Sequence, residues 1–286
     1  MSVAKGSSPR LLAVSDLHVG HPENRTIVAA LRPEREGDWL IVAGDLGETI
    51  AEIEWSLDTL TSRFAKVIWT PGNHDLWTLP DEFPALRGES RYRRLVELCR
   101  ARGVLTPEDP YLVWEGESGP LLVAPVFLLY DYSFGRDDLA SRAQALAQAE
   151  RVGVLCSDEF LLHPDPYHDR AEWCHARVRH TEERLRQCPA DVPLALVNHF
   201  PLTEHPTAVL RHPEFAMWCG TRLTDDWHRR FDVAVVVYGH LHIPRTTWRD
   251  GVRFEEVSLG NPREWRLRAG GVPFLRTIAP FPSPPA

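Results

Sequence analysis

Gly239-His240-Leu241-His242 is the last of five short polar motifs that decide the fold of this chain. The other four, in chain order, are Asp16-Leu17-His18, Gly44-Asp45, Gly72-Asn73-His74-Asp75 and Asn198-His199. Each motif follows a short run of aliphatic or β-branched residues, which is typical of a buried strand. We therefore expect each motif to lie where a strand ends and a loop begins, at the ligand-binding edge of an α/β sheet.

The side chains of these motifs are suitable ligands for two metal ions. Carboxylate, imidazole and amide groups together suit Mn²⁺, Fe²⁺ or Fe³⁺, Zn²⁺, Co²⁺ and Ni²⁺, and the order of affinities alone does not choose among them. No cysteine lies in the motifs, which excludes a structural zinc site with thiolate ligands. Two cations about 4 Å apart can each hold a phosphoryl oxygen and neutralise the charge that builds there. Asp45 is the natural candidate for a carboxylate that bridges the two ions.

In their order, the five motifs resemble those of the calcineurin-like metallophosphoesterase superfamily, which read D-x-H, G-D, G-N-H-[DE], H and G-H-x-H. The resemblance covers residues 16–242 but says little about residues 76–190, which match no motif. It implies an α/β fold, a four-layer αββα sandwich, and a metal-dependent phosphoric ester hydrolase. By resemblance, one metal ion would be held by Asp16, His18, Asp45 and His242, and the other by Asp45, Asn73, His199 and His240.

His74 is the candidate for proton transfer, because the resemblance implies that it points toward the substrate. An imidazole with a pKa of about 6.5 can donate a proton to a departing alkoxide, which is typically worth about 10²–10⁴-fold in rate. Asp45 or Asp75 could orient the ring, and the sequence does not say which. The alternative interpretation is that His74 only braces its loop by hydrogen bonding.

These observations predict a dinuclear metal hydrolase that cleaves a phosphate ester by direct attack of a metal-bridging hydroxide, with Asp45 and His74 as catalytic residues. The favoured interpretation is a phosphatase acting on a small phosphorylated metabolite or nucleotide. The alternative is a phosphodiesterase acting on a cyclic nucleotide or another small diester. Additional arginines in the pocket would favour a dianionic monoester, whereas a wide, aromatic pocket would favour a diester.

Two other classes of function are less consistent with the sequence. The formal net charge is −8 and Lys5 and Lys66 are the only lysines, whereas binding to nucleic acid depends largely on clustered positive charge. A nuclease is therefore disfavoured. A non-catalytic interaction module that kept the fold would be expected to have lost ligands, and none is missing here.

Residues 76–190 are predicted to be an insertion that shapes the substrate pocket within a single domain of residues 1–286, because the ligands span almost the whole chain. Trp77, His21 and His205 lie a few residues from ligand motifs and are candidates to line the pocket. Arg136 is a candidate to contact a phosphate oxygen. The aromatic residues of 130–134 are expected either to pack on a strand face or to form a wall for an organic leaving group.

The scaffold can also be predicted in part. Apolar residues at helical spacing predict a helix over about residues 49–64, and further helices are expected over residues 138–151 and 167–187. Arg249-Asp250-Gly251 between two strand-like runs predicts a β-hairpin. The basic run of residues 91–94 is interpreted as the solvated face of a helix.

The sequence also bears on location. The absence of an 18-residue apolar run and of an apolar leader near Met1 predicts a cytoplasmic protein with no membrane partner. Five cysteines, an odd number without close pairing, predict reduced thiols. The oligomeric state is left open.

Overall fold

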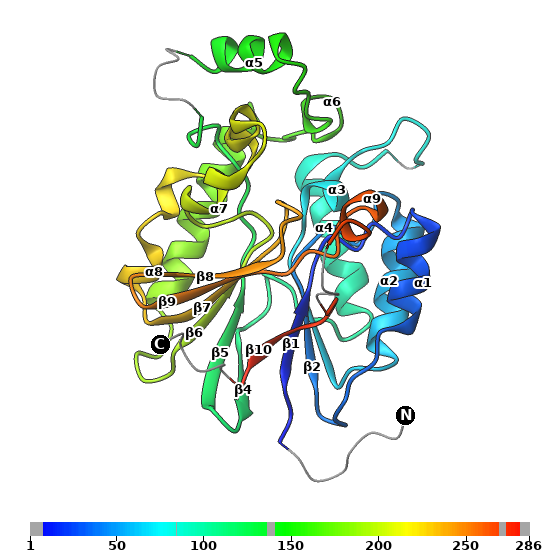
Figure 1. The fold of residues 1–286 in the computed structure, drawn as a ribbon, viewed down its shortest axis with the longest axis vertical. Coiled ribbons are helices and arrows are strands. Elements are labelled where there is room, and N and C mark those ends of the chain that lie inside the picture. Colours follow the sequence, from blue (N-terminus) through cyan, green and yellow to red (C-terminus); the bar gives the residue numbers. More distant parts are fainter. Residues whose placement is uncertain (1–7, 84, 136–140, 269–272, 281–286) are drawn as a thin grey trace.

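The computed structural model describes residues 8–83, 85–135, 141–268 and 273–280, which form two β-sheets flanked by helices (Figure 1). One sheet has the strand order β10 (Arg276–Ala279), β1 (Leu11–Val14), β2 (Trp39–Val42) and β3 (Lys66–Trp69). The other has the order β4 (Leu112–Gly116), β5 (Gly119–Pro125), β6 (Leu194–Val197), β7 (Val233–Tyr238), β9 (Val252–Glu256) and β8 (Arg245–Arg249). The central strands of both sheets are parallel, while β10, β4 and β8 pair antiparallel at the edges.

The layers follow from the near-continuous apolar character of the strands, which must be buried on both faces. Facing side chains of the two sheets form one buried cluster, which includes Ile41, Ile68, Val123, Val197 and Val235. The helices α1 (Pro22–Ala30), α2 (Ile50–Thr61) and α4 (Gly88–Arg100) lie outside the four-stranded sheet, and α7 (Arg170–Arg186) and α8 (Trp227–Arg230) lie outside the six-stranded sheet (Figure 1). The predicted four-layer αββα sandwich is thus confirmed.

Local signals account for two of the predicted elements. The predicted helix of residues 49–64 is α2, which begins after a capping box in which the Thr49 side chain accepts from the Glu52 backbone N–H. The predicted hairpin is formed by β8 and β9. Its two turn residues, Asp250 and Gly251, both have positive φ, at 50° and 79°, as a type I′ turn requires.

Residues 76–190 contribute both to the layers and to the rim of the ligand edge. Strand β5 pairs with β6 inside the six-stranded sheet, so this part of the segment is scaffold. In contrast, α5 (Arg142–Arg151) and α6 (Asp158–Leu161) lie beyond the ends of the strands, on the side where α3 (Asn73–Leu76) and α9 (Pro262–Trp265) also lie (Figure 1). Helix α7 begins at Arg170 rather than near residue 167, because the Asp169 side chain caps it by accepting from the Glu172 backbone N–H.

The basic run of residues 91–94 is only partly the solvated helix face that the sequence suggested. Arg93 and Arg94 are exposed, but Arg91 is buried and forms an ion pair with Glu82. The prediction was wrong for Arg91 because a carboxylate 9 residues earlier in the chain compensates its charge. None of the helices in the described part of the chain has the length and apolarity that a membrane crossing requires.

Candidate metal centre

All seven predicted ligands meet at one edge of the two sheets. Strands β1, β2 and β3 end just before Asp16, Asp45 and Asn73. Strands β6 and β7 of the other sheet end just before the His199 and His240 motifs. Because parallel strands bring their carboxyl ends to the same edge, motifs 226 residues apart come within hydrogen-bonding distance.

The first ligand set, called the Asp16 site, consists of Asp16, His18, Asp45 and His242. The His242 Nε2 atom lies 3.0 Å from Asp16 Oδ1 and 3.3 Å from His18 Nε2. The His18 Nε2 atom lies 3.9 Å from Asp45 Oδ2. Ring nitrogens and carboxylate oxygens therefore point at a common centre.

The second set, called the Asn73 site, consists of Asp45, Asn73, His199 and His240. The Asn73 Oδ1 atom lies 3.1 Å from His199 Nε2 and 3.2 Å from His240 Nδ1. The Asp45 Oδ2 atom lies 3.4 Å from His199 Nε2 and also faces His18 of the Asp16 site. Asp45 therefore lies between the two sets, where a bridging carboxylate is needed.

The chemistry of these donors fits a pair of cations. Among the described residues, three groups of carboxylates and imidazoles have ligand atoms that all lie within 4.8 Å of one another, and Asp45 belongs to two of these groups. Burial, reinforced by neighbouring imidazoles, lowers the pKa of His18 and of His240 to about 3, so both rings are neutral and able to bind metal. Burial disfavours an ionised Asp16, but the charges of His242 and His199 still hold its pKa well below the ordinary value.

The backbone is strained at the same residues. The φ angles of Asp16, His18, Asp45, His240 and His242 are 52°, 41°, 55°, 70° and 56°, all in the left-handed region. Residues other than glycine rarely adopt this conformation, and it costs on the order of 1–3 kcal/mol each. Such a concentration of strain in five of seven predicted ligands is typical of a functional site.

His74 lies beside the two ligand sets, and its partner is a residue that the sequence did not suggest. Its Nδ1 atom lies 3.1 Å from Glu48 Oε1, so neither Asp45 nor Asp75 orients the ring. Asp75 instead accepts hydrogen bonds from the backbone N–H groups of Asp45 and Leu46, at 3.0 and 2.9 Å, and braces their loop. The available signal for Glu48 was its position three residues after Asp45 on the same loop.

The protonation of His74 follows from these contacts. Burial disfavours a charged imidazole, but the charge of Asp45 and the hydrogen bond with Glu48 raise the pKa of His74 above its ordinary value. The ring of Trp77 lies over the imidazole, with 3.6 Å between ring centroids. His74 therefore lies next to the two ligand sets, and its raised pKa favours the protonated imidazole.

A cavity of about 330 Å³ opens over the ligand sets. Its wall contains Asp45, Asn73, His74, His240 and His242. Apolar side chains make up much of the remainder: Trp77, Leu155, Leu210, Phe215 and Leu241. None of the described residues that line this cavity is an arginine or a lysine.

The other predicted pocket residues lie elsewhere. His205 is exposed and is not part of the cavity wall, and His21 lies at an exposed position 3.1 Å from Asn261 Oδ1. Arg136 falls outside the described residues. Tyr130 and Phe134 are buried in the core, which supports the packing interpretation for these aromatic residues.

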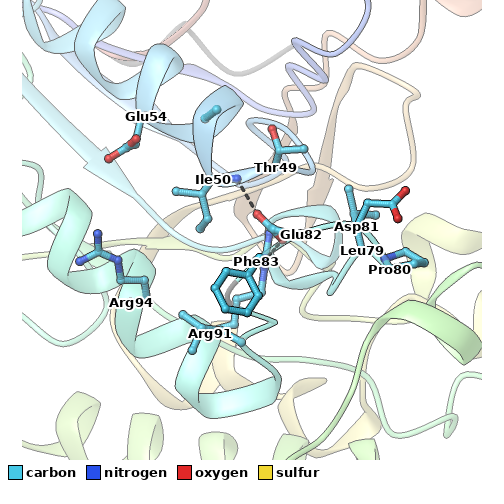
Figure 2. Close-up of a pocket in the computed structure, with 12 residues that line it drawn as sticks. Thr49, Ile50, Glu54, Leu79, Pro80, Asp81, Glu82, Phe83, Arg91 and Arg94 are labelled. Carbon is cyan, nitrogen blue, oxygen red and sulfur yellow. Dashed lines mark hydrogen bonds and ion pairs between the residues drawn. The ribbon is translucent and has the colours of Figure 1, made fainter.

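A second and larger cavity, of about 760 Å³, lies between the start of α2, residues 79–83 and α4 (Figure 2). None of the seven predicted ligands is among the described residues that line it. Glu82 accepts a hydrogen bond from the Ile50 backbone N–H there, at 2.9 Å (Figure 2). It also forms an ion pair with Arg91. Glu82 thus ties the start of α2 to α4.

Two further carboxylates contact the predicted ligands from outside the motifs. Glu264 of α9 lies 2.6 Å from His242 Nδ1, which directs Nε2 of that ring toward the Asp16 site. Asp158 of α6 accepts a hydrogen bond from the Asn73 side chain. The sequence offered no motif for either residue, since both lie outside the five motif blocks.

Comparison with known proteins agrees with this geometry. A family model described as calcineurin-like phosphoesterase matches residues 9–244. The chain is 52% identical over 277 residues to the [acyl-carrier-protein] phosphodiesterase PptH of Mycobacterium tuberculosis (strain ATCC 25618 / H37Rv), covering 97% of this chain and 85% of that protein.

One solved structure gives the same result. The crystal structure of phosphopantetheinyl hydrolase (PptH) from Mycobacterium tuberculosis matches with a TM-score of 0.94 and 52% identity, covering 98% of this chain and 100% of that one. A putative 5′-nucleotidase from Staphylococcus aureus matches with a TM-score of only 0.41 and 14% identity, covering 87% of this chain and 48% of that one.

Proposed function

The chain belongs to the calcineurin-like phosphoesterase family, and from this premise we propose that it hydrolyses the phosphodiester that joins a phosphopantetheinyl group to an acyl carrier protein. The names of the relative that is 52% identical over 97% of this chain support this substrate. The proposal replaces the small-metabolite phosphatase that the sequence favoured with the phosphodiesterase alternative. It also replaces a small-molecule substrate with a protein-bound one.

The observation that carries the choice of a diester is the wall of the metal-site cavity. A phosphomonoester carries up to two negative charges, and recognising a dianion usually calls for arginine or lysine beside the metal ions. A diester carries only one negative charge and has an organic group on each side. The cavity wall has no arginine or lysine among its described residues, and much of it is apolar, including Trp77, Leu155 and Phe215. This lining suits the diester.

We propose that the two ligand sets hold two divalent or mixed-valence metal ions, whose identity among Mn, Fe, Zn, Co and Ni is left open. When bound, such a pair supplies positive charge for the phosphoryl oxygens and lowers the pKa of a coordinated water molecule. Asp45 would hold both ions, and the other six ligands would fix their positions. The apolar wall around Trp77 would exclude bulk water from the ester.

His74 is proposed to donate the proton to the leaving oxygen. Glu48 lies at Nδ1, so Nε2 is the nitrogen that can present a proton to the cavity that His74 lines. The raised pKa of His74 keeps this proton available near neutral pH. Trp77 would also contact the substrate, and Arg136 and His205 remain proposed contacts for the larger parts of a protein-bound ester.

We further propose that residues 1–286 act as one catalytic domain in the cytoplasm. The predicted ligands extend from Asp16 to His242, so a split between them would divide the site. Residues 76–190 supply part of the cavity wall through Leu155 and its neighbours. All five cysteines are free thiols in the structure, which is consistent with a reducing compartment.

The deciding experiment offers the Mn²⁺-loaded protein a phosphopantetheinylated carrier protein, a chromogenic diester and a chromogenic monoester. We expect loss of the phosphopantetheinyl group from the carrier, detected by mass spectrometry, and hydrolysis of the diester in preference to the monoester. Asp45→Asn should abolish both activities. Hydrolysis of the monoester alone, with an intact carrier, would contradict the proposal and return the small-metabolite phosphatase to first place.

A further inference from the structure

A carboxylate of the middle segment, residues 76–190, contacts the Asn73 site although it lies outside the five motifs. Asp158 is fully buried, and its Oδ1 atom accepts a hydrogen bond of 3.0 Å from Asn73 Nδ2. An ionised carboxylate can only accept hydrogen bonds, so it selects the NH₂ end of the amide. Asp158 therefore holds one end of the Asn73 amide and leaves the carbonyl oxygen facing the other way.

The orientation of this amide decides whether Asn73 can bind a cation. Its Oδ1 atom converges with His199 Nε2 and His240 Nδ1, at 3.1 and 3.2 Å. A half-turn of the amide would bring two N–H donors to that position, and an N–H donor cannot coordinate a cation. A ring nitrogen that binds a cation presents a lone pair rather than an N–H, so neither imidazole would hold the Oδ1 atom in place by donating a hydrogen bond to it.

We propose that Asp158 is a positioning residue for the Asn73 site, which fixes the amide of Asn73 in the orientation that binds the second metal ion. The inference rests on the proposed role of Asn73 as a ligand and does not depend on which ester is cleaved. It assigns a function to the middle segment beyond that of a pocket wall. This segment orients a ligand of the Asn73 site and has no such role in the Asp16 site.

Asp158 acts on the ligand rather than on the ion. Among the described residues, the clusters whose ligand atoms lie within 4.8 Å of one another do not include Asp158. Its Oδ1 atom is occupied twice, since Trp77 Nε1 donates a second hydrogen bond to it at 2.6 Å. Its buried Oδ2 atom has no hydrogen-bond partner among the described residues.

The short helix that carries Asp158 is itself fixed by a buried cation. Arg170 donates from Nη1 to the backbone carbonyls of Asp158 and Leu162, both at 2.9 Å, and so spans α6 from end to end. The same guanidinium pairs with Glu159, which accepts a further hydrogen bond of 2.8 Å from Trp218 Nε1. Asp158 is therefore held rigidly enough to orient a neighbour.

The test titrates the full chain with Mn²⁺ alone, following each binding step by calorimetry and by electron paramagnetic resonance. We expect Asp158→Ala to weaken binding of one ion about 10–100-fold, as is typical when the partner of a metal ligand is lost, and to leave the other ion unaffected. Asp158→Asn keeps an acceptor oxygen and should restore the second ion. Should Asp158→Ala fail to fold, Asp158→Ser takes its place.

Two controls separate this role from a structural one. Trp77→Phe removes the other donor to Asp158 and should leave both ions bound with parental affinity. In an Asn73→Ala background, Asp158→Ala should not weaken metal binding any further, because the amide that Asp158 positions is already absent. Equal weakening of both ions, or an undiminished effect in the Asn73→Ala background, would overturn the inference. Because no ester is present, these outcomes are independent of the proposed reaction.

Discussion

The Asp16 and Asn73 sites share Asp45 but differ in depth and in what holds their ligands. The His242 side chain of the Asp16 site is 18% exposed, whereas His199 of the Asn73 site is fully buried. Glu264, near the end of the chain, braces the shallow site through an imidazole, and the middle segment braces the deep site through an amide. The comparison shows that the two proposed metal sites, which are built from one set of motifs, are braced by different parts of the molecule.

The largest effect should come from the residue that the two sites share. Replacing Asp45 with asparagine removes the bridging charge while keeping the side-chain shape. We expect both ions to bind weakly and hydrolysis to fall by more than the roughly 10²–10⁴-fold that loss of a general acid costs. Metal analysis after gel filtration, alongside the diester assay, measures both losses. Retention of two ions by Asp45→Asn would mean that the two sites are not joined as described.

A change at His74 should reduce activity while leaving both sites intact. We expect His74→Asn to lower kcat roughly 10²–10⁴-fold for an ester with an alkoxide leaving group, because no proton is donated to it. An ester with a nitrophenolate leaving group needs no such proton and should be much less affected. Glu48→Gln should show the same dependence on leaving group to a smaller degree. A uniform loss across leaving groups would instead favour the loop-bracing interpretation of His74.

A change at Glu264 should affect the shallow site alone. Glu264→Gln keeps the shape but removes the charge that directs the His242 ring, so affinity at the Asp16 site should fall about 10–100-fold. Stepwise removal of the ions with a chelator, followed by metal analysis, should show one ion leaving earlier than in the parent protein. Asp158→Ala, in contrast, should affect only the ion at the Asn73 site. If both variants weaken binding of the same ion, Glu264 and Asp158 do not support different sites.

The smallest effect concerns pH, and it applies to protein from which metal has been removed. Burial disfavours protonation of His199, but Asp45 and Asp16 raise its pKa to about 9, above the ordinary 6.5. The folded state then binds more protons than the unfolded state between these values, so the contribution of His199 to stability is full below about pH 6.5 and declines toward pH 9. Thermal denaturation of the metal-free protein at several pH values measures this decline. The metal-loaded protein should show much less of it, because the ion replaces the proton.

The fold and the meeting of the predicted ligands at one edge could be predicted because that information is local, whereas the division of the ligands into two sets came from the family resemblance. Asp16 and its motif follow a strand directly, and parallel strands bring such positions to one edge whatever the intervening chain does. The Asp250-Gly251 turn is a similar case, since the two residues determine the turn type by themselves. These parts required no knowledge of distant contacts.

The supporting residues could not be predicted, because their roles exist only after folding. Asp158 lies 85 residues from Asn73 in the sequence, and nothing beside it indicates that its partner is an amide. Arg91 illustrates the same difficulty: its place in a basic run suggested solvent, and only the folded chain brings Glu82 against it. The protein-bound nature of the proposed substrate could not be predicted either, because none of the five motifs indicates a carrier protein.

The left-handed backbone at five predicted ligands has an evolutionary consequence. Glycine adopts that conformation more readily than aspartate or histidine does, so the substitution that relieves the most strain at these positions also removes the ligand atom. Selection for metal binding and selection for a stable chain therefore oppose each other there. A duplicated copy that is no longer selected for catalysis would be expected to change first at these five positions. Its thermal stability should rise as its catalytic activity is lost.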